Sequence, residues 1–150
     1  MTTADEVADY LLTLADARGE EVNNLKLHKL LYYAQAWHLG RYGERLFPER
    51  FQAWSTGPVI PALYWKYKPW GIRHIGQHGE PPAFDGRVAR LLSDVADEYM
   101  WMDEYDLADL TYRESPWIEA RGGIDIADPC ETELDENGMR VFFQHLTEAA

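Results

Sequence analysis

The segment from Leu25 to Leu39 constrains the fold most, because its apolar residues extend well beyond one stripe of a helix. One set follows the i, i+3, i+4, i+7 spacing of an amphipathic helix: Leu27, Leu30, Leu31, Ala34, Trp37 and His38. Leu25, Tyr32, Tyr33, Ala36 and Leu39 broaden that surface. We therefore expect a central helix with neighbours on more than one side. Asn23 or Asn24 can cap it, and Gly40 and Gly43 are expected to end it.

Other segments also have helical periodicity and recognisable caps. Thr3 and Glu6 form a capping-box pattern before a first helix that Gly19 closes. Asp85 can cap a helix with the stripe Val88, Leu91, Leu92, Val95 and Tyr99. Shorter helices are predicted over residues 62–67, with Pro61 as a first helical residue, and over residues 103–113 and 115–121, with Ser115 as a cap. A last helix uses Met139, Phe142, Phe143 and Leu146.

The helical period is lost between Gly43 and Pro61. Residues 50–54 are typical of an extended segment, and Thr56-Gly57-Pro58 is a turn signal, which we interpret as a structural turn. Residues 71–86 contain four glycines and two prolines, so they are expected to form a long flexible connection. The predicted fold is mainly α: a compact single-domain helical bundle over residues 1–150, with one small β-hairpin or extended segment around residues 46–60.

Composition narrows the class of protein. No apolar run approaches the roughly 18 residues of a membrane span, and the first residues lack the features of a secretory signal. A single cysteine, Cys130, excludes an internal disulfide and fits a reducing compartment. We therefore expect a cytoplasmic protein without membrane contact.

The formal net charge of −12 is concentrated in one third of the chain. Residues 85–136 carry sixteen acidic and four basic side chains, whereas residues 1–84 carry nine of each. Such a field repels phosphate, so direct nucleic-acid binding is disfavoured, although basic residues near aromatics, such as Lys26 and Lys29, are typical of a single-strand groove. Two interpretations of the acidic region remain: a solvated face, or a surface for a basic protein partner.

Residues with catalytic or metal-binding potential occur only in weak patterns. His74 and His78 have metal-ligand spacing, but they lie in the Gly/Pro-rich connection, where helical geometry does not apply. Cys130 and His145 could pair as nucleophile and base, although one cysteine and five histidines offer such a pair by chance. Carboxylate pairs such as Asp94 with Glu98 are equally typical of exposed acidic faces. No metal site and no cofactor is predicted.

Several motifs together resemble a known family. They are Leu25 to Leu39, Leu46-Phe47, Ala53 to Tyr64, and Leu107 to Trp117 with Ser115-Pro116-Trp117 at its end. In this order and spacing they resemble the Panacea domain of SocA-like antitoxins, related to GepA-like phage-associated proteins. The resemblance covers residues 7–121 and leaves a C-terminal helical extension over 134–148.

The resemblance implies a helical domain without known catalysis, whose members neutralise toxins encoded beside them, usually by direct binding. One branch delivers its toxin to a cytoplasmic protease. The residues that carry the resemblance are interpreted as a structural signature: Gln35, Trp37, His38, Trp54, Gly57, Pro58, Pro61, Pro116 and Trp117.

Residues 27–70 hold 11 of the 20 aromatic side chains, too many for all of them to be core. Within this block Trp65 and Trp70 are flanked by lysines and a loop, so we expect them to reach the surface. With Tyr64 and Lys66 they form the predicted partner-binding set, because aromatic residues dominate interface energies.

The sequence therefore predicts an antitoxin that binds a co-encoded toxin, with a basic toxin as one possibility, and that has no enzymatic activity. Three alternatives remain open. They are an adaptor for a cytoplasmic protease, a small hydrolase or toxin-modifying enzyme using Cys130 or a histidine such as His38, and an acidic phage protein that mimics DNA through residues 94–109. The oligomeric state is not predicted.

Overall fold

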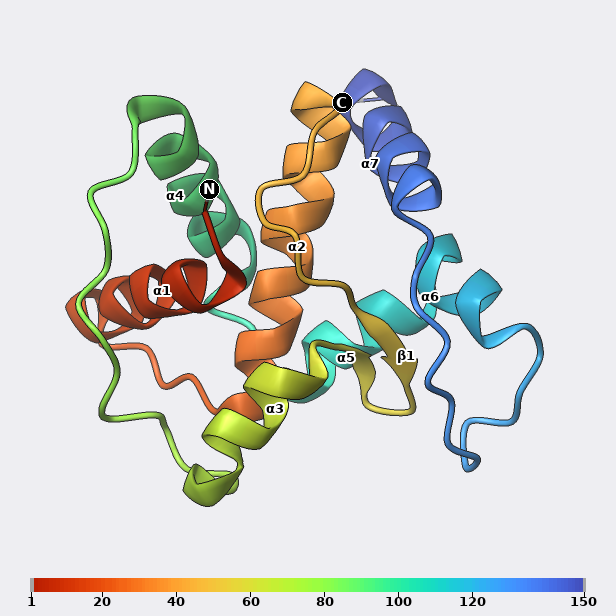
Figure 1. Ribbon diagram of the computed structural model, residues 1–150, viewed down its shortest axis with the longest axis horizontal. Helices are drawn as coiled ribbons and strands as arrows, with labels where there is room; N and C mark the ends of the chain where they lie inside the picture. The colour runs from red at the N-terminus through yellow and green to blue at the C-terminus, as the bar shows by residue number, and fades with distance from the viewer. Residues whose placement is uncertain (1, 150) are drawn as a thin grey trace.

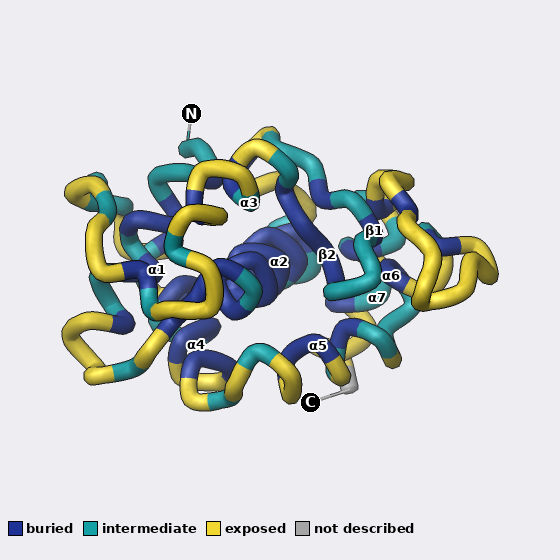
Figure 2. Tube along the Cα trace, turned by 90° about the horizontal axis from the view of Figure 1, so that it is seen from below, coloured by how far each residue is buried: buried dark blue, intermediate teal, exposed yellow. Residues whose placement is uncertain are grey.

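The computed structural model describes residues 2–149 and is organised around α2 (Asn24–Tyr42), which stands in the middle of the molecule (Figure 1). Coloured by burial, α2 is the darkest element and is surrounded by the other helices (Figure 2). Tyr32, Tyr33 and Gln35 have no exposed surface at all. The expectation of a central helix is confirmed, as is a mainly α fold.

The ends of α2 follow from local chemistry. The Asn23 side chain accepts a hydrogen bond from the Lys26 N–H at 2.9 Å, and Gly43 ends the helix in the left-handed conformation at φ 69°. The prediction that Gly40 also helps to end the helix is wrong, because the helix continues through it to Tyr42. Gly40 has another role: a Cβ there would lie 2.8 Å from the Phe143 Cβ. The glycine lets another helix approach closely.

That neighbouring helix is α7 (Glu136–Ala149), which runs beside α2 (Figure 1). The Phe143 ring is fully buried and meets the rings of Tyr32, Tyr33 and Trp37 edge-on, at centroid distances of 5.0 to 6.0 Å. Leu146, expected on the same apolar stripe, is 40% exposed, because the packing with α2 is centred one turn earlier at Phe143.

The opposite side of α2 is covered by α1 (Ala4–Arg18) and α4 (Gly86–Tyr99). Both begin as predicted, since the Thr3 capping box is complete and the Asp85 side chain accepts from the Val88 N–H at 2.9 Å. Ion pairs at the surface connect these helices. Arg18 lies 2.8 Å from Asp97, and Arg41 on α2 lies 2.9 Å from Asp94.

The predicted hairpin consists of β1 (Gln52–Trp54) and β2 (Gly57–Val59), which pair antiparallel with Ala53 opposite Pro58. Gly57 has a backbone φ of 112°, a conformation that residues with a side chain rarely adopt. Pro61 then opens α3 (Pro61–Tyr67), where its fixed φ suits the first turn, and a short 3₁₀ turn, η1 (Lys68–Trp70), follows.

Two further helices hold the hairpin in place, α5 (Glu104–Tyr112) and α6 (Ser115–Arg121). The Trp117 indole N–H donates to the Trp54 carbonyl at 2.9 Å, and the Arg121 guanidinium donates to the Ala53 carbonyl at 3.0 Å. Buried Pro116 lies in the first turn of α6. Ser115 is already helical, so its predicted capping role is wrong: Glu114 occupies the cap position, and its side chain makes no capping bond.

Residues 71–85 form no helix or strand, yet several bonds attach them to α1 and its C-terminal loop. The Ile75 N–H donates to the Val22 carbonyl, and the Gly79 N–H donates to Asp9. The Nε2 atoms of His74 and His78 each lie 3.0 Å from a different carboxylate oxygen of Asp16. The predicted long connection is therefore present, but its middle is held against the helical body.

Within residues 2–149, no helix is both long and apolar enough to cross a membrane. Over the same residues, no group of three or more His, Cys, Asp and Glu side chains could hold a metal ion.

Candidate partner-binding surfaces

The first surface is an aromatic ridge made of Trp54, Tyr64, Trp65 and Lys68, where α3 passes the hairpin. The Tyr64 ring lies between the two tryptophans, 4.9 Å from Trp54 and 5.5 Å from Trp65. The Lys68 ammonium lies 5.3 Å from the Tyr64 ring and 5.2 Å from the Trp65 ring. Trp65 remains 60% exposed. The ridge thus presents a large apolar ring whose position is fixed by its neighbours.

Of the four predicted contact residues, Tyr64 and Trp65 lie side by side in the ridge. Lys66 and Trp70 make contacts outside it. Lys66 forms an ion pair with Asp5 of α1. Trp70 is half-buried against the core, with the Arg73 guanidinium 5.3 Å from its ring. The exposed aromatic area of the predicted set is therefore concentrated at Trp65.

The signature residues Gln35 and His38 hold the chain that follows α2. Gln35 is fully buried; its amide donates to the Phe47 carbonyl at 2.7 Å and accepts from the Leu46 and Phe47 N–H groups. The buried His38 ring lies 2.6 Å from the Glu44 carbonyl through Nδ1. Both side chains satisfy backbone groups of a loop, which explains why polar residues occupy this helix.

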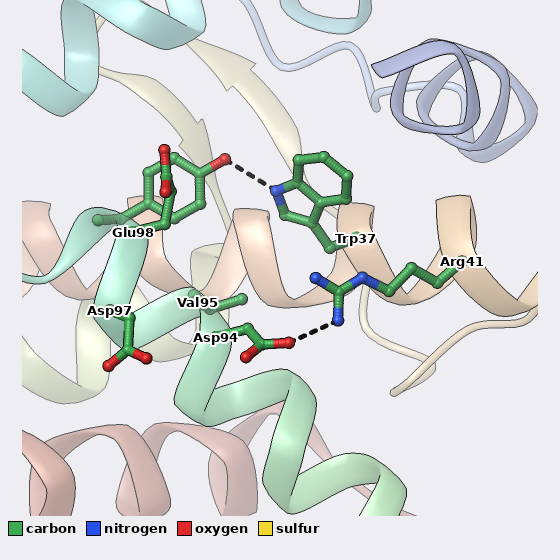
Figure 3. Close-up of a pocket in the computed structure, with 7 residues that line it drawn as sticks. Trp37, Arg41, Asp94, Val95, Asp97 and Glu98 are labelled. Atoms are coloured by element: carbon green, nitrogen blue, oxygen red, sulfur yellow. Dashed lines mark hydrogen bonds and ion pairs between the residues drawn. The ribbon is translucent and has the colours of Figure 1, made fainter. Parts of the chain in front are cut away.

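Trp37 lines a cavity of about 440 Å³ between α2 and α4 (Figure 3). Its indole N–H donates to the Tyr99 hydroxyl at 2.8 Å, and Arg41 reaches across to Asp94. Two contacts thus join side chains that line this cavity, as the dashed lines in Figure 3 show, whereas Asp97 pairs with Arg18 of α1. Trp37 joins two helices here.

The second surface is an acidic groove, a cavity of about 470 Å³ between the α1–α2 connection and the start of α5. Four carboxylates line it: Glu20, Glu21, Asp103 and Glu104. Ile72 and Trp101 also line the groove and are 85% and 68% exposed. This combination of exposed apolar side chains and like charge suits a basic partner segment.

Lys26 also lines the groove and is almost completely buried. Burial lowers the pKa of its ammonium group, and the carboxylates of Glu20, Glu104, Asp103 and Glu21 act in the opposite direction. Lys26 therefore offsets part of the negative charge of the groove.

Sequence reasoning missed Trp101 and Ile72. Trp101 comes two residues after Tyr99, the last residue of the α4 stripe, and an apolar residue just past a helix end gives no periodic signal. The Met100-Trp101-Met102 triplet was the available clue.

The structure does not join the residues considered for catalysis. Cys130 is buried beside Trp54 and Ser55, whereas His145 is exposed on α7 with Glu148 as its ion-pair partner. Among the described residues, no hydrogen bond connects Cys130 to a histidine.

The architecture is that of a mainly α-helical domain with exposed aromatic and acidic surfaces. The family model of the SocA-like antitoxin, Panacea domain, matches residues 27–118. The chain therefore belongs to the SocA-like antitoxin family. This finding confirms the resemblance drawn from the sequence motifs.

One curated relative is Antitoxin SocA of Caulobacter vibrioides (strain NA1000 / CB15N), 39% identical over 72 residues. The aligned segment covers 48% of this chain and 38% of that protein. No solved structure matches the chain.

Proposed function

We propose that this protein neutralises a co-encoded toxin by direct binding, without catalytic turnover, and that the toxin docks on the aromatic ridge. The observation that carries the proposal is the state of Trp65: exposed, yet fixed between Tyr64 and Lys68. A large ring that is already positioned loses little conformational entropy on binding. Family membership supports the antitoxin role.

The acidic groove has a separate part in this proposal. Its carboxylates attract a basic toxin during diffusion, which raises the association rate more than the final affinity. The ridge then supplies the apolar anchor that slows dissociation. Residues 85–136, with sixteen acidic and four basic side chains, extend the same negative field.

The decisive experiment begins with the protein encoded beside this chain. Expressed alone it should arrest growth, and co-expression of this chain should relieve the arrest and yield a complex on gel filtration. Toxicity that persists despite equal expression of a folded chain would contradict the antitoxin role.

Three further experiments separate the alternatives. Protection that is lost only in a protease-deficient host would identify a proteolytic adaptor. A folded Cys130→Ala or His38→Ala variant that still binds the toxin but no longer neutralises it would identify an enzyme. Charge reversals across residues 94–109 that abolish activity, with Trp65→Ala harmless, would identify a DNA mimic.

A further inference from the structure

The corner between α5 and α6 contains a partly buried carboxyl group, that of Glu114. Among residues 2–149 its side chain accepts hydrogen bonds from one donor, the Tyr33 hydroxyl on α2, which lies 3.1 and 3.2 Å from the two carboxyl oxygens. An ionised carboxylate can accept several hydrogen bonds at once. A single neutral donor therefore compensates a charge at this position poorly.

Tyr33 depends on Glu114 in return. The Tyr33 side chain has no exposed surface, and its hydroxyl is bonded to Glu114 alone among the described residues. The Tyr33 ring stacks on that of Tyr99 in α4, with the centroids 4.0 Å apart. Because a buried hydroxyl without a partner is unfavourable, this contact ties the start of α6 to the centre of the molecule.

The same corner holds the turn of the hairpin. Two residues before Glu114, the Tyr112 hydroxyl donates to the Ser55 carbonyl at 2.6 Å. Three residues after it, the Trp117 indole N–H donates to the carbonyl of Trp54, a residue of the aromatic ridge. A movement of the corner would therefore disturb the bonds that position residues 54 and 55.

The electrostatics of the corner favour the neutral form of the carboxyl group. Burial raises the pKa of Glu114 to about 7, against the Tyr33 hydrogen bond and the positive charge of Arg113 at the end of α5. The folded chain thus binds the proton more tightly than the unfolded chain. The resulting contribution to stability is complete below the ordinary carboxyl value of 4.5 and is lost as the pH rises through about 7.

The other groups around the carboxyl do not change charge in this range. Tyr32 and Tyr33 face it from α2 and Tyr99 from α4, and burial raises the pKa of all three phenols. On α7, the Phe143 ring packs against Tyr33 and does not titrate.

We propose that Glu114 and Tyr33 form a pH-sensitive switch that controls how firmly the α5–α6 corner is held against α2. With a neutral carboxyl group the switch is closed, and the two side chains are in contact. When the proton is lost to solvent, the carboxylate turns toward water and Arg113, and the corner loosens. The switch does not depend on the proposed antitoxin activity.

The first test is a pH titration of the full chain by NMR. The carboxyl carbon of Glu114 should titrate near pH 7. The exchange protection of the Trp117 indole N–H should fall at least about 5-fold between about pH 6 and pH 8. Protection is the ratio to the exchange rate of an unstructured indole at the same pH, so base catalysis cancels. A Glu114 carboxyl that is already fully ionised at pH 6 would overturn the switch.

The second test removes the charge. Glu114→Gln keeps the length of the side chain and an acceptor oxygen but stays neutral, so the protection of Trp117 should remain high and constant over this range. Glu119→Gln is the matched control, because it removes an exposed carboxyl group from the same helix and should retain the wild-type fall. A fall of wild-type size in folded Glu114→Gln is incompatible with the switch.

The third test removes the donor. Tyr33→Phe keeps the ring on Tyr99 but deletes the hydroxyl, so the protection of Trp117 should be low at both ends of the range. An undiminished fall in folded Tyr33→Phe would show that the corner responds to another group. The wild-type titration decides the proposal even where a variant does not fold.

Discussion

The aromatic ridge and the acidic groove both expose a tryptophan, but they are assembled from different parts of the chain. All four ridge residues come from fifteen consecutive positions, Trp54 to Lys68. The groove combines residues 19–26 with 72–74 and 101–104. Trp65 is fixed by rings and a cation, whereas the Trp101 indole N–H donates to the carbonyl of Glu98, one turn earlier.

This difference separates two functions that one surface could combine. The rings of the ridge meet edge to face and offer contact area with little net charge, so in the proposed function the ridge acts on the lifetime of a complex. The carboxylates of the groove offer a long-range field, so in the proposed function the groove acts on the rate of encounter. Variants that change one surface at a time test this division of roles.

The largest expected effect is on the ridge. Trp65→Ala should weaken toxin binding by at least about 2 kcal/mol, roughly 30-fold, through faster dissociation. Trp101→Ala is the matched control, because it removes an equally exposed tryptophan from the groove. Surface plasmon resonance measures both rates. If Trp101→Ala speeds dissociation and Trp65→Ala does not, the two surfaces exchange roles.

The next prediction compares the two buried lysines of α2, Lys26 at the groove and Lys29 one turn further along the helix. Lys29→Met should raise the free energy of unfolding by about 1–2 kcal/mol, because burial disfavours the charged ammonium group and the methionine side chain is apolar. Lys26→Met should not, because it leaves the carboxylates of the groove without their cation. Urea denaturation at neutral pH measures both. A stabilised Lys26→Met together with a destabilised Lys29→Met would reverse this interpretation.

Removing negative charge from the groove should slow association with the toxin and leave the dissociation rate unchanged. The double variant Glu20→Gln, Glu21→Gln should bind a basic toxin about 10-fold more slowly at low ionic strength, with dissociation unchanged. The difference should shrink as salt screens the field. Glu131→Gln with Glu133→Gln removes the same charge from another exposed segment, and stopped-flow association rates compare the two. Equal slowing by both pairs would mean that net charge, not the groove, is responsible.

The smallest expected effect is on the connection that brings Ile72 to the groove. The Asp16 contact raises the pKa of His78 against its burial, and the two histidines lower the pKa of Asp16. The His78 contribution is complete below its unfolded pKa of about 6.5 and is lost as pH rises through the raised folded value. The Asp16 contribution is complete above about 3.8 and is lost as pH falls through the lowered value.

The connection should therefore be held most firmly between about pH 4 and pH 6.5. Hydrogen exchange at the Ile75 and Gly79 amides should be slowest there relative to Asp16→Asn, by a free energy below about 1 kcal/mol, because Asp16 is solvent-exposed. His145→Gln is the control on an exposed histidine. An unchanged exchange profile in Asp16→Asn would show that backbone bonds alone hold the connection.

Local signals in the sequence anticipated much of this structure. The caps Thr3, Asn23 and Asp85, the turn at Gly57 and the first-turn Pro61 all act within a few residues, so the pattern alone identifies them. Tyr64 and Trp65 of the ridge were predicted as contact residues for the same reason, whereas Trp54 was assigned to the structural signature and Lys68 was outside the predicted set. The groove could not be predicted in this way, because it forms where segments distant in sequence meet.

Buried polar residues were the second source of error. Lys26 and Lys29 were considered for a basic surface, yet both are buried in the folded chain. Gln35 was recognised only through family resemblance, since its partners at Leu46 and Phe47 lie eleven and twelve residues away in a loop. A periodic pattern reports which face is apolar, but not which polar groups find partners there.

The close passage of α7 over Gly40 limits how this domain can be transplanted. The family match ends at residue 118, but the ring that seals Tyr32, Tyr33 and Trp37 belongs to Phe143. A fusion protein built from residues 27–118 alone would leave these rings open to water. It would therefore be prone to self-association unless its new neighbour supplied a helix with a bulky ring opposite the glycine.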